Sequence, residues 1–283
     1  MSVILKLAEY FSFSFVRYAF VVSILVSLCA ALLGVSLVLK RYSMIGDGLS
    51  HIAFGAGAVS AVLNVAGMSI TLPATVATAV LLLTTKSKKK IMGDSAIAML
   101  SAGSLALGYL LLNVTGTTSS NLSGDVCTSL FGSTSILTLS KSDVTLSLVL
   151  AVVVIFVFAF FFNKIFSVTF DERFAEATGT HVNAYNLVVA IMSAVVIVIG
   201  MKLVGALLVS ALVIFPALSA MRICKSYKGV ILASCVIAII SSSVGLIFAL
   251  LLETPVGAGI VCVNIVAFGV CATVGAIKAK IKK

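Results

Sequence analysis

An aspartate and a histidine stand four residues apart in an otherwise apolar stretch, as Asp47 and His51 of SMIGDGLSHIAFGAGAVS. If this stretch is helical, positions i and i+4 lie on one face, with Cβ atoms about 5–6 Å apart. One carboxylate and one imidazole at that separation suit a borderline divalent ion such as zinc, manganese or ferrous iron. Because ionisable groups inside a membrane span are costly and usually functional, we interpret the two residues as a candidate metal-binding pair.

Two simpler interpretations of the pair stay open at this point. Asp47 follows Arg41 by six residues and could cap a helix N-terminus near the membrane interface. His51 could instead donate a hydrogen bond to a neighbouring span. Two ligands are also too few for a tight site, so further side chains, carbonyl oxygens or a second copy of the chain would have to complete it. Weak binding would suit an ion that must leave again.

The elements that position this pair are predicted to be membrane helices. Hydrophobic residues make up 61% of the 283 residues and charged residues only 10%, which is more apolar surface than a soluble core can bury. A bilayer-spanning helix needs about 20 mostly apolar residues, and such runs recur along the chain. The predicted spans are 17–39, 46–66, 70–85, 94–112, 144–163, 183–201, 203–221, 230–251 and 256–277. The fold class is therefore an all-α polytopic membrane bundle, in a single domain over residues 1–283.

The distribution of basic residues predicts the orientation in the membrane. Cytoplasmic loops carry an excess of Lys and Arg. With nine spans and the N-terminus outside, fifteen of the nineteen Lys and Arg residues lie on the cytoplasmic side. We expect the N-terminus outside and the C-terminus inside. The net charge of +10 thus reflects loop charges, and nucleic-acid binding is not expected.

Two connecting segments have features of their own. Residues 122–142 are semi-polar, which indicates a short interfacial helix or a re-entrant segment on the outer side. On the cytoplasmic side, IFSVTFDERFAEATGTHV predicts a short helix at about 168–179, with Asp171 as N-cap and Gly179 as its end. Phe170, Phe174 and Ala177 recur at helical spacing and would form one apolar face. Such a helix could dock a soluble partner or simply lie on the surface as a connector.

Other motifs narrow the class of protein. Pro216 falls inside the seventh predicted span, where it removes a backbone hydrogen bond and kinks the helix, a feature of some gates. The sequence contains no GxxxxGK[ST] loop, HExxH or GxSxG. We therefore expect a protein that is not itself an enzyme and holds no permanently bound cofactor.

Four segments in order resemble one known family, and the resemblance covers essentially the whole chain. They are GDGLSH at 46–51, LFGSTSILTLSKSD at 130–143, FDERFAEATG at 170–179 and VGALLVSALVIFPALSAMR at 204–222. Together they look like the membrane permease of the zinc/manganese/iron ABC importers. One departure is Phe54-Gly55, where the family often has a Leu-Pro pair.

The resemblance implies a fold, partners and residue roles. It implies a permease like that of the vitamin B12 importer, a type II ABC importer, in the bacterial plasma membrane. The permease would form a homodimer, bind a cytoplasmic ATPase subunit and receive metal from an extracellular solute-binding protein. Asp47 and His51 would contact the passing ion. The residues expected to couple the permease to the ATPase are Phe170, Asp171, Phe174 and Ala175.

The predicted function is an ATP-driven importer for a divalent transition metal, with zinc ranked ahead of manganese and iron. The closest alternative is a permease for iron chelates or cobalamin, which would need a roomy path and no metal-ligand pair. An ATP-independent secondary carrier should show broken helices in two matching halves, and the sequence has no such symmetry. A receptor or scaffold that transports nothing would leave Asp47 and His51 unexplained.

Overall fold

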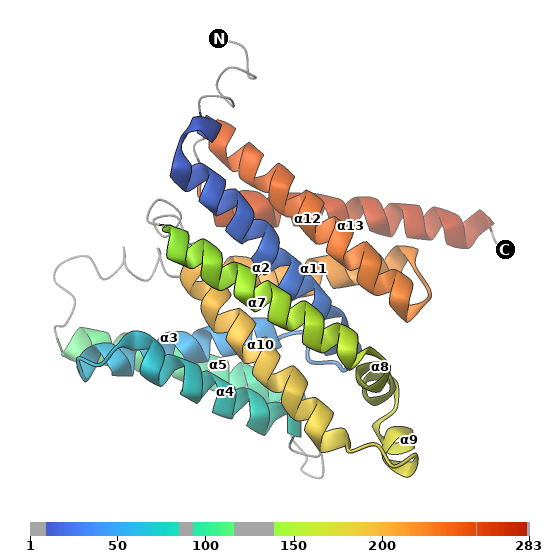
Figure 1. The fold of residues 1–283 in the computed structure, drawn as a ribbon, viewed down its shortest axis with the longest axis horizontal. Helices are drawn as coiled ribbons and strands as arrows, with labels where there is room; N and C mark the ends of the chain where they lie inside the picture. Colours follow the sequence, from blue (N-terminus) through green and yellow to red (C-terminus); the bar gives the residue numbers. More distant parts are fainter. Residues whose placement is uncertain (1–9, 85–92, 116–138, 253, 282–283) are drawn as a thin grey trace.

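The computed structural model describes residues 10–84, 93–115, 139–252 and 254–281, and every regular element in these ranges is a helix (Figure 1). The prediction of an all-α fold is confirmed. The long helices are α2 (Ser14–Leu39), α3 (Ile45–Val62), α4 (Gly67–Thr84), α5 (Gly93–Val114), α7 (Lys141–Phe160), α10 (Val182–Val204), α11 (Ala206–Ile223), α12 (Tyr227–Leu252) and α13 (Val256–Ile281). Two short helices, α8 (Phe162–Phe170) and α9 (Glu172–Ala177), lie between α7 and α10.

Within the described ranges, eight of the long helices are long and apolar enough to cross a membrane. The ninth, α3, falls short of that criterion, and it is the helix that carries Asp47 and His51 among several glycines and serines. Each predicted span corresponds to one of these nine helices. The predicted semi-polar segment at 122–142 lies, up to residue 138, outside the described residues. In the described end of this segment, the Ser140 backbone N–H donates to Asp143 Oδ2 (3.0 Å), which caps the start of α7.

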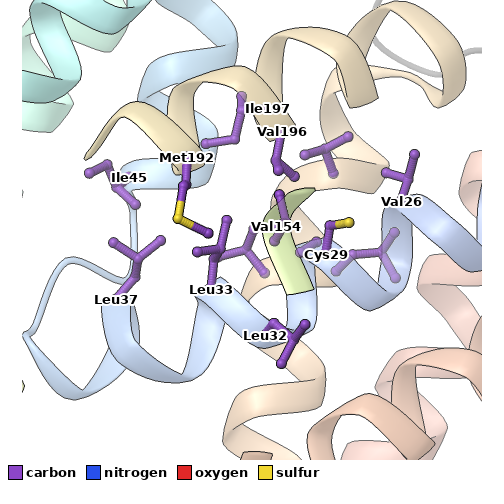
Figure 2. Packing of buried hydrophobic residues seen from close by; sticks show 14 of the residues in the cluster. Val26, Cys29, Leu32, Leu33, Leu37, Ile45, Val154, Met192, Val196 and Ile197 are labelled. Carbon is purple, nitrogen blue, oxygen red and sulfur yellow. The ribbon is translucent and has the colours of Figure 1, made fainter. Parts of the chain in front are cut away.

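Helix α2 lies at the centre of the bundle. It packs against α7, α10, α11 and α12, and most of its side chains are buried. Figure 2 shows part of this core, where Leu33 and Leu37 of α2 lie among Ile45 of α3 and Met192 and Ile197 of α10. Because no water is available in the hydrocarbon to satisfy free backbone groups, a helix is the form in which such an apolar run can be buried.

The outer helices expose apolar side chains instead. In α5, α7 and α13 no more than 22% of each membrane-spanning stretch is buried in the single chain. Exposed large side chains there include Leu107 of α5, Phe156 of α7 and Val266 of α13. These apolar surfaces match a lipid environment or contacts with other membrane chains. The outer helix α7 is as apolar as the central helix α2, with a mean hydropathy of 2.7 for both, so hydropathy alone does not separate central from outer helices.

Helix α3 is held closely against α5 by small residues. A Cβ on Gly48 would lie 2.3 Å from Cγ2 of Ile97, and a Cβ on Gly55 would lie 2.6 Å from the backbone oxygen of Ser104. Small residues at seven-residue spacing let two membrane helices approach along one seam. The seam fixes α3, and with it the direction in which the Asp47 and His51 side chains point.

This seam predicts different effects for two neighbouring glycines. Gly55→Ala should destabilise the purified permease by about 1–3 kcal/mol, because the added methyl meets backbone that cannot move aside. Gly57→Ala is the matched control, since its Cβ would lie 3.7 Å from the nearest atom, Oγ1 of Thr71. Thermal unfolding of both variants in one detergent measures the difference. Equal unfolding temperatures for the two variants would contradict the close packing of α3 against α5 at Gly55.

Candidate metal site and cytoplasmic coupling surface

Asp47 and His51 meet on one face of α3, as the i, i+4 spacing predicts. His51 Nε2 lies 3.3 Å from Asp47 Oδ1. The His51 side chain is 17% exposed and the Asp47 side chain 41% exposed, so the imidazole is enclosed while the carboxylate remains accessible. The pair is thus a half-open site with an oxygen donor at its accessible end.

The two simpler interpretations of the pair do not match this geometry. The N-cap of α3 is Met44, and Asp47 already lies inside the first helical turn. Its charge is favourable near the helix N-terminus, but it does not cap the helix. His51 faces Asp47 of its own helix through Nε2, and its buried Nδ1 has no hydrogen-bond partner among the described residues. A buried nitrogen without a partner is a feature that needs an explanation.

A cavity of about 680 Å³ lies beside the second half of α3, between α3, α4, α5 and α10. Its lining includes Phe54, Ala58 and Ala61. Phe54 and Ala58 follow His51 by three and seven positions and lie near its face of α3, whereas Ala53 and Gly57, which also line the cavity, lie on an adjacent side of the helix. The lining is mostly apolar, and its ionisable residue is Lys202. The cavity and the candidate metal site thus lie at adjoining positions along the same helix.

The donor set of this site is small. No group of three or more His, Cys, Asp or Glu side chains that could hold a metal occurs in the part of the chain that the structure describes. One carboxylate and one imidazole could hold a divalent ion only with help from water, carbonyl oxygens or another chain. Such a site is suited to brief contact with a passing ion.

The predicted Asp171 cap of the short helix before α10 is confirmed. Asp171 Oδ1 accepts hydrogen bonds from the backbone N–H groups of Arg173 (2.9 Å) and Phe174 (3.0 Å). Helix α9 ends at Ala177, and Gly179, just beyond its C-cap Thr178, has a φ of +80°, a left-handed conformation that glycine adopts without strain. The Thr180 N–H bonds back to the oxygen of Ala175, which completes a Schellman motif.

The predicted extent of this helix, about 168–179, is wrong. Asp171 is extended, and it separates α8, which ends at Phe170, from α9, which comprises six residues. Phe170 and Ala177 therefore do not share one continuous helix face. The strong N-cap interrupts the helix that the apolar spacing suggested.

The four residues expected to contact an ATPase differ in exposure. Phe170 is 60% and Phe174 64% exposed, and Asp171 is exposed as well. Ala175 is fully buried, in a small cluster with Val168 and Val182. Ala175 can therefore anchor α9 to α8 and α10, but in this conformation it cannot touch a partner.

Helix α8 is attached to the membrane core by aromatic packing. The ring of Tyr227, at the start of α12, lies 5.0 Å from that of Phe166 and 5.8 Å from that of Phe170. The Tyr227 hydroxyl and the Ser36 hydroxyl of α2 form a buried hydrogen bond of 2.9 Å. Because ring packing and a buried hydrogen bond act on the same residue, α8 is held against the C-terminal end of α2 and the start of α12.

A polar contact that the sequence analysis missed joins α9 to the end of α2. Lys40 Nζ lies 2.9 Å from Glu172 Oε1, and the lysine side chain is only 7% exposed. Lys40 also donates to Asn186 Oδ1 of α10, whose Nδ2 donates in turn to Glu172 Oε1 (3.0 Å). Lys40 and Glu172 are 132 positions apart, so no local sequence signal could have paired them.

Pro216 is buried inside α11, which continues as a helix on both sides of it. The ring of the preceding Phe215 packs edge-on against that of Phe268 of α13, with centroids 6.3 Å apart. Pro216 therefore belongs to the packed interior between α11 and its neighbours. Its role as a kink or gate stays a prediction.

Comparison with known proteins extends these observations. The chain is 27% identical to the manganese import system permease protein ScaB of Streptococcus gordonii, over 90% of each chain. It is 31% identical to a probable metal transport system membrane protein of Thermotoga maritima, over 90% of this chain and 88% of the other.

Solved structures agree with the sequence relatives. The structure of PsaBC from Streptococcus pneumoniae in complex with Fab superposes with a TM-score of 0.81 at 26% identity, over 95% of both chains. A metal-chelate type ABC transporter in an inward-facing conformation gives a TM-score of 0.69 at 17% identity, over 90% of this chain and 85% of the other, which shows the fold alone. The fold is thus an all-α membrane bundle like that of type II ABC importers.

The family assignment covers nearly the whole chain. The model of the ABC 3 transport family matches residues 12–275, which include α3, α8 and α9 as well as every other helix up to most of α13. The chain therefore belongs to the ABC 3 transport family, as a membrane-spanning transport component and not as the ATPase.

Proposed function

We propose that this chain is the permease of an ATP-driven importer for a divalent transition metal, with Asp47 and His51 as transient ligands on the translocation path. The observation that carries the proposal is their juxtaposition, 3.3 Å apart on α3, the helix that also lines the cavity. A carboxylate oxygen and an imidazole nitrogen fit manganese, ferrous iron and zinc. The names of the curated relatives favour manganese over the zinc that sequence analysis ranks first.

The incompleteness of the site supports transport. A resident metal is normally enclosed by four or more ligands, whereas a transported ion must be released. Two side-chain ligands with an accessible carboxylate would let an ion exchange its remaining ligands for water. A second copy of the permease across a two-fold axis is the partner that we propose to complete the path. A chelated metal or cobalamin would not need such a pair.

The energy for transport must come from another chain, since this sequence has no nucleotide-binding loop. We propose that a cytoplasmic ATPase subunit docks on α9 and the end of α8, where Phe170 and Phe174 expose apolar rings. An extracellular solute-binding protein would deliver the metal. The corresponding orientation has the N-terminus outside and the C-terminus in the cytoplasm of a bacterial plasma membrane.

Replacing the carboxylate should abolish metal uptake. In transporter-deficient cells that express the complete system, Asp47→Asn should lower accumulation of the transported metal by at least about tenfold, because it removes an anionic ligand. The matched control is Asp143→Asn, which changes a carboxylate that caps α7 away from the pair. Elemental analysis of the cells measures zinc, manganese and iron together, and therefore identifies the ion as well.

Both variants must reach the membrane and bind the ATPase subunit for this comparison to count. If Asp47→Asn cells accumulated as much metal as wild-type cells, Asp47 would not lie on the path. If the wild-type system moved none of the three metals, the chelate or cobalamin alternative would replace the proposal.

The docking surface predicts a specific loss of partner binding. Phe174→Ala should weaken co-purification of the ATPase subunit by about tenfold or more, since aromatic anchors dominate interface energies. Phe156→Ala is the control, because Phe156 is similarly exposed (68%) but lies on α7, which we expect to face lipid. Undiminished ATPase binding by Phe174→Ala would instead indicate a surface-lying connector helix.

A further inference from the structure

The contact between Lys40, Glu172 and Asn186 is built from three separate elements. Lys40 is the residue that ends α2, Glu172 begins α9, and Asn186 lies in the first turns of α10. Each of the three side chains is bonded to the other two. Asn186 is 3% exposed and Lys40 is nearly as buried, while Glu172 reaches the cytoplasmic surface. The contact therefore connects the surface helix to the interior.

Because Lys40 is buried, loss of this contact would be energetically costly. Burial lowers the pKa of the Lys40 ammonium, and the hydrogen bond and charge of Glu172 act in the opposite direction. An ammonium group without a partner in a buried place is strongly unfavourable. If α9 moves, Glu172 moves with it, and the lysine must either follow or lose its counter-charge.

The chain from Lys40 to the metal-ligand pair is short and constrained. The end of α2 is a Schellman motif, in which the Tyr42 N–H bonds to the oxygen of Leu37 at 3.0 Å. Arg41 occupies the left-handed position with φ of +64°, where a residue with a Cβ is strained. Helix α3 begins four residues later, and Asp47 lies in its first turn. A displacement of Lys40 would therefore also displace the start of α3, because the connecting turn is short and constrained.

The other end of the contact adjoins the proposed docking surface. Glu172 and Phe174 are two residues apart on the six-residue α9. That helix is tied at both ends, by the Asp171 cap and by the Schellman motif at Gly179, so it moves as a unit. A partner that pushes on Phe174 would thus move the Glu172 carboxylate as well.

We propose that Lys40 is a positioning residue that makes the Asp47–His51 pair respond to the ATPase, through its contact with Glu172 and Asn186. The inference rests on the proposed function and adds a specific route between its two sites. Lys40 does not touch the metal or the nucleotide. It holds the turn between α2 and α3 in register with α9.

The alternative role for the contact is a static staple that only stabilises the fold. A staple and a coupling element differ in one measurable ratio, the amount of metal transported per ATP hydrolysed. Loss of a staple lowers the amount of active complex and leaves this ratio unchanged. Loss of coupling lowers the ratio in complexes that are fully assembled.

The test uses the complete permease–ATPase complex in proteoliposomes, with the binding protein and manganese as the transported probe. Lys40→Met keeps the apolar stem and removes the ammonium. We expect at least about a fivefold lower ratio of manganese transported to ATP hydrolysed, at the lower end of allosteric coupling effects. Lys164→Met is the control, because Lys164 is exposed on α8 and lies outside the contact. It should retain the wild-type ratio.

A second variant covers the case in which Lys40→Met fails to assemble. Glu172→Gln keeps an oxygen acceptor toward Lys40 and Asn186 and removes only the charge, and it should also lower the ratio. An unchanged ratio in whichever of these variants assembles would overturn the proposal and leave Lys40 as a staple. If the wild-type complex transported no manganese, zinc or iron, the proposed function itself would fail, which is a separate outcome.

Discussion

A polar group in the interior of this protein is costly unless it finds its partner within the protein, because the surrounding hydrocarbon offers none. The backbone meets this constraint by forming helices throughout the described ranges. Many hydroxyl groups meet it locally, as in Ser193 of α10, which donates to the oxygen of Val189 one turn earlier, while those of Ser23 and Ser219 have no partner among the described residues. A backbone oxygen or N–H group does not neutralise a charge, so an ionisable group needs a second side chain beside it. Asp47 therefore stands beside His51, and the buried Lys40 beside Glu172.

The two pairs differ in how completely their polar groups are bonded. The Lys40 ammonium is bonded to two side chains from two other elements, so it ties those elements together. In the Asp47–His51 pair the carboxylate is accessible, and Nδ1 of the histidine has no partner within the described ranges. A satisfied pair is suited to holding a structure in place. A partly satisfied pair is suited to receiving a ligand, which is the role that we propose for it.

Much of this architecture follows from local sequence signals. Long apolar runs place the nine helices, i, i+4 spacing places His51 over Asp47, and a good capping residue places the start of α9 at Asp171. These features depend on residues within a few positions of one another, which is the range over which helix geometry fixes neighbours. The family resemblance, carried by four ordered segments, was also sufficient to indicate the family to which the chain belongs.

The features that could not be predicted from the sequence depend on tertiary packing. Nothing near Lys40 shows that a glutamate 132 positions away will neutralise it. Apolar spacing suggested one helix through Phe170 and Ala177, whereas the Asp171 cap divides it, because a side chain that bonds the next N–H groups starts a new helix. The burial of Ala175 depends on Val168 and Val182, which meet only after α8 and α10 have packed.

The most direct test of the account is to locate the ion itself. Crystals of the assembled transporter grown with manganese, and measured at the manganese absorption edge, would show the metal by its anomalous scattering. The account predicts a peak at coordination distance, about 2.0–2.2 Å, from an Asp47 carboxylate oxygen and a His51 ring nitrogen. A manganese peak inside the membrane region that is bound by other residues, with Asp47 and His51 still paired to each other, would contradict it.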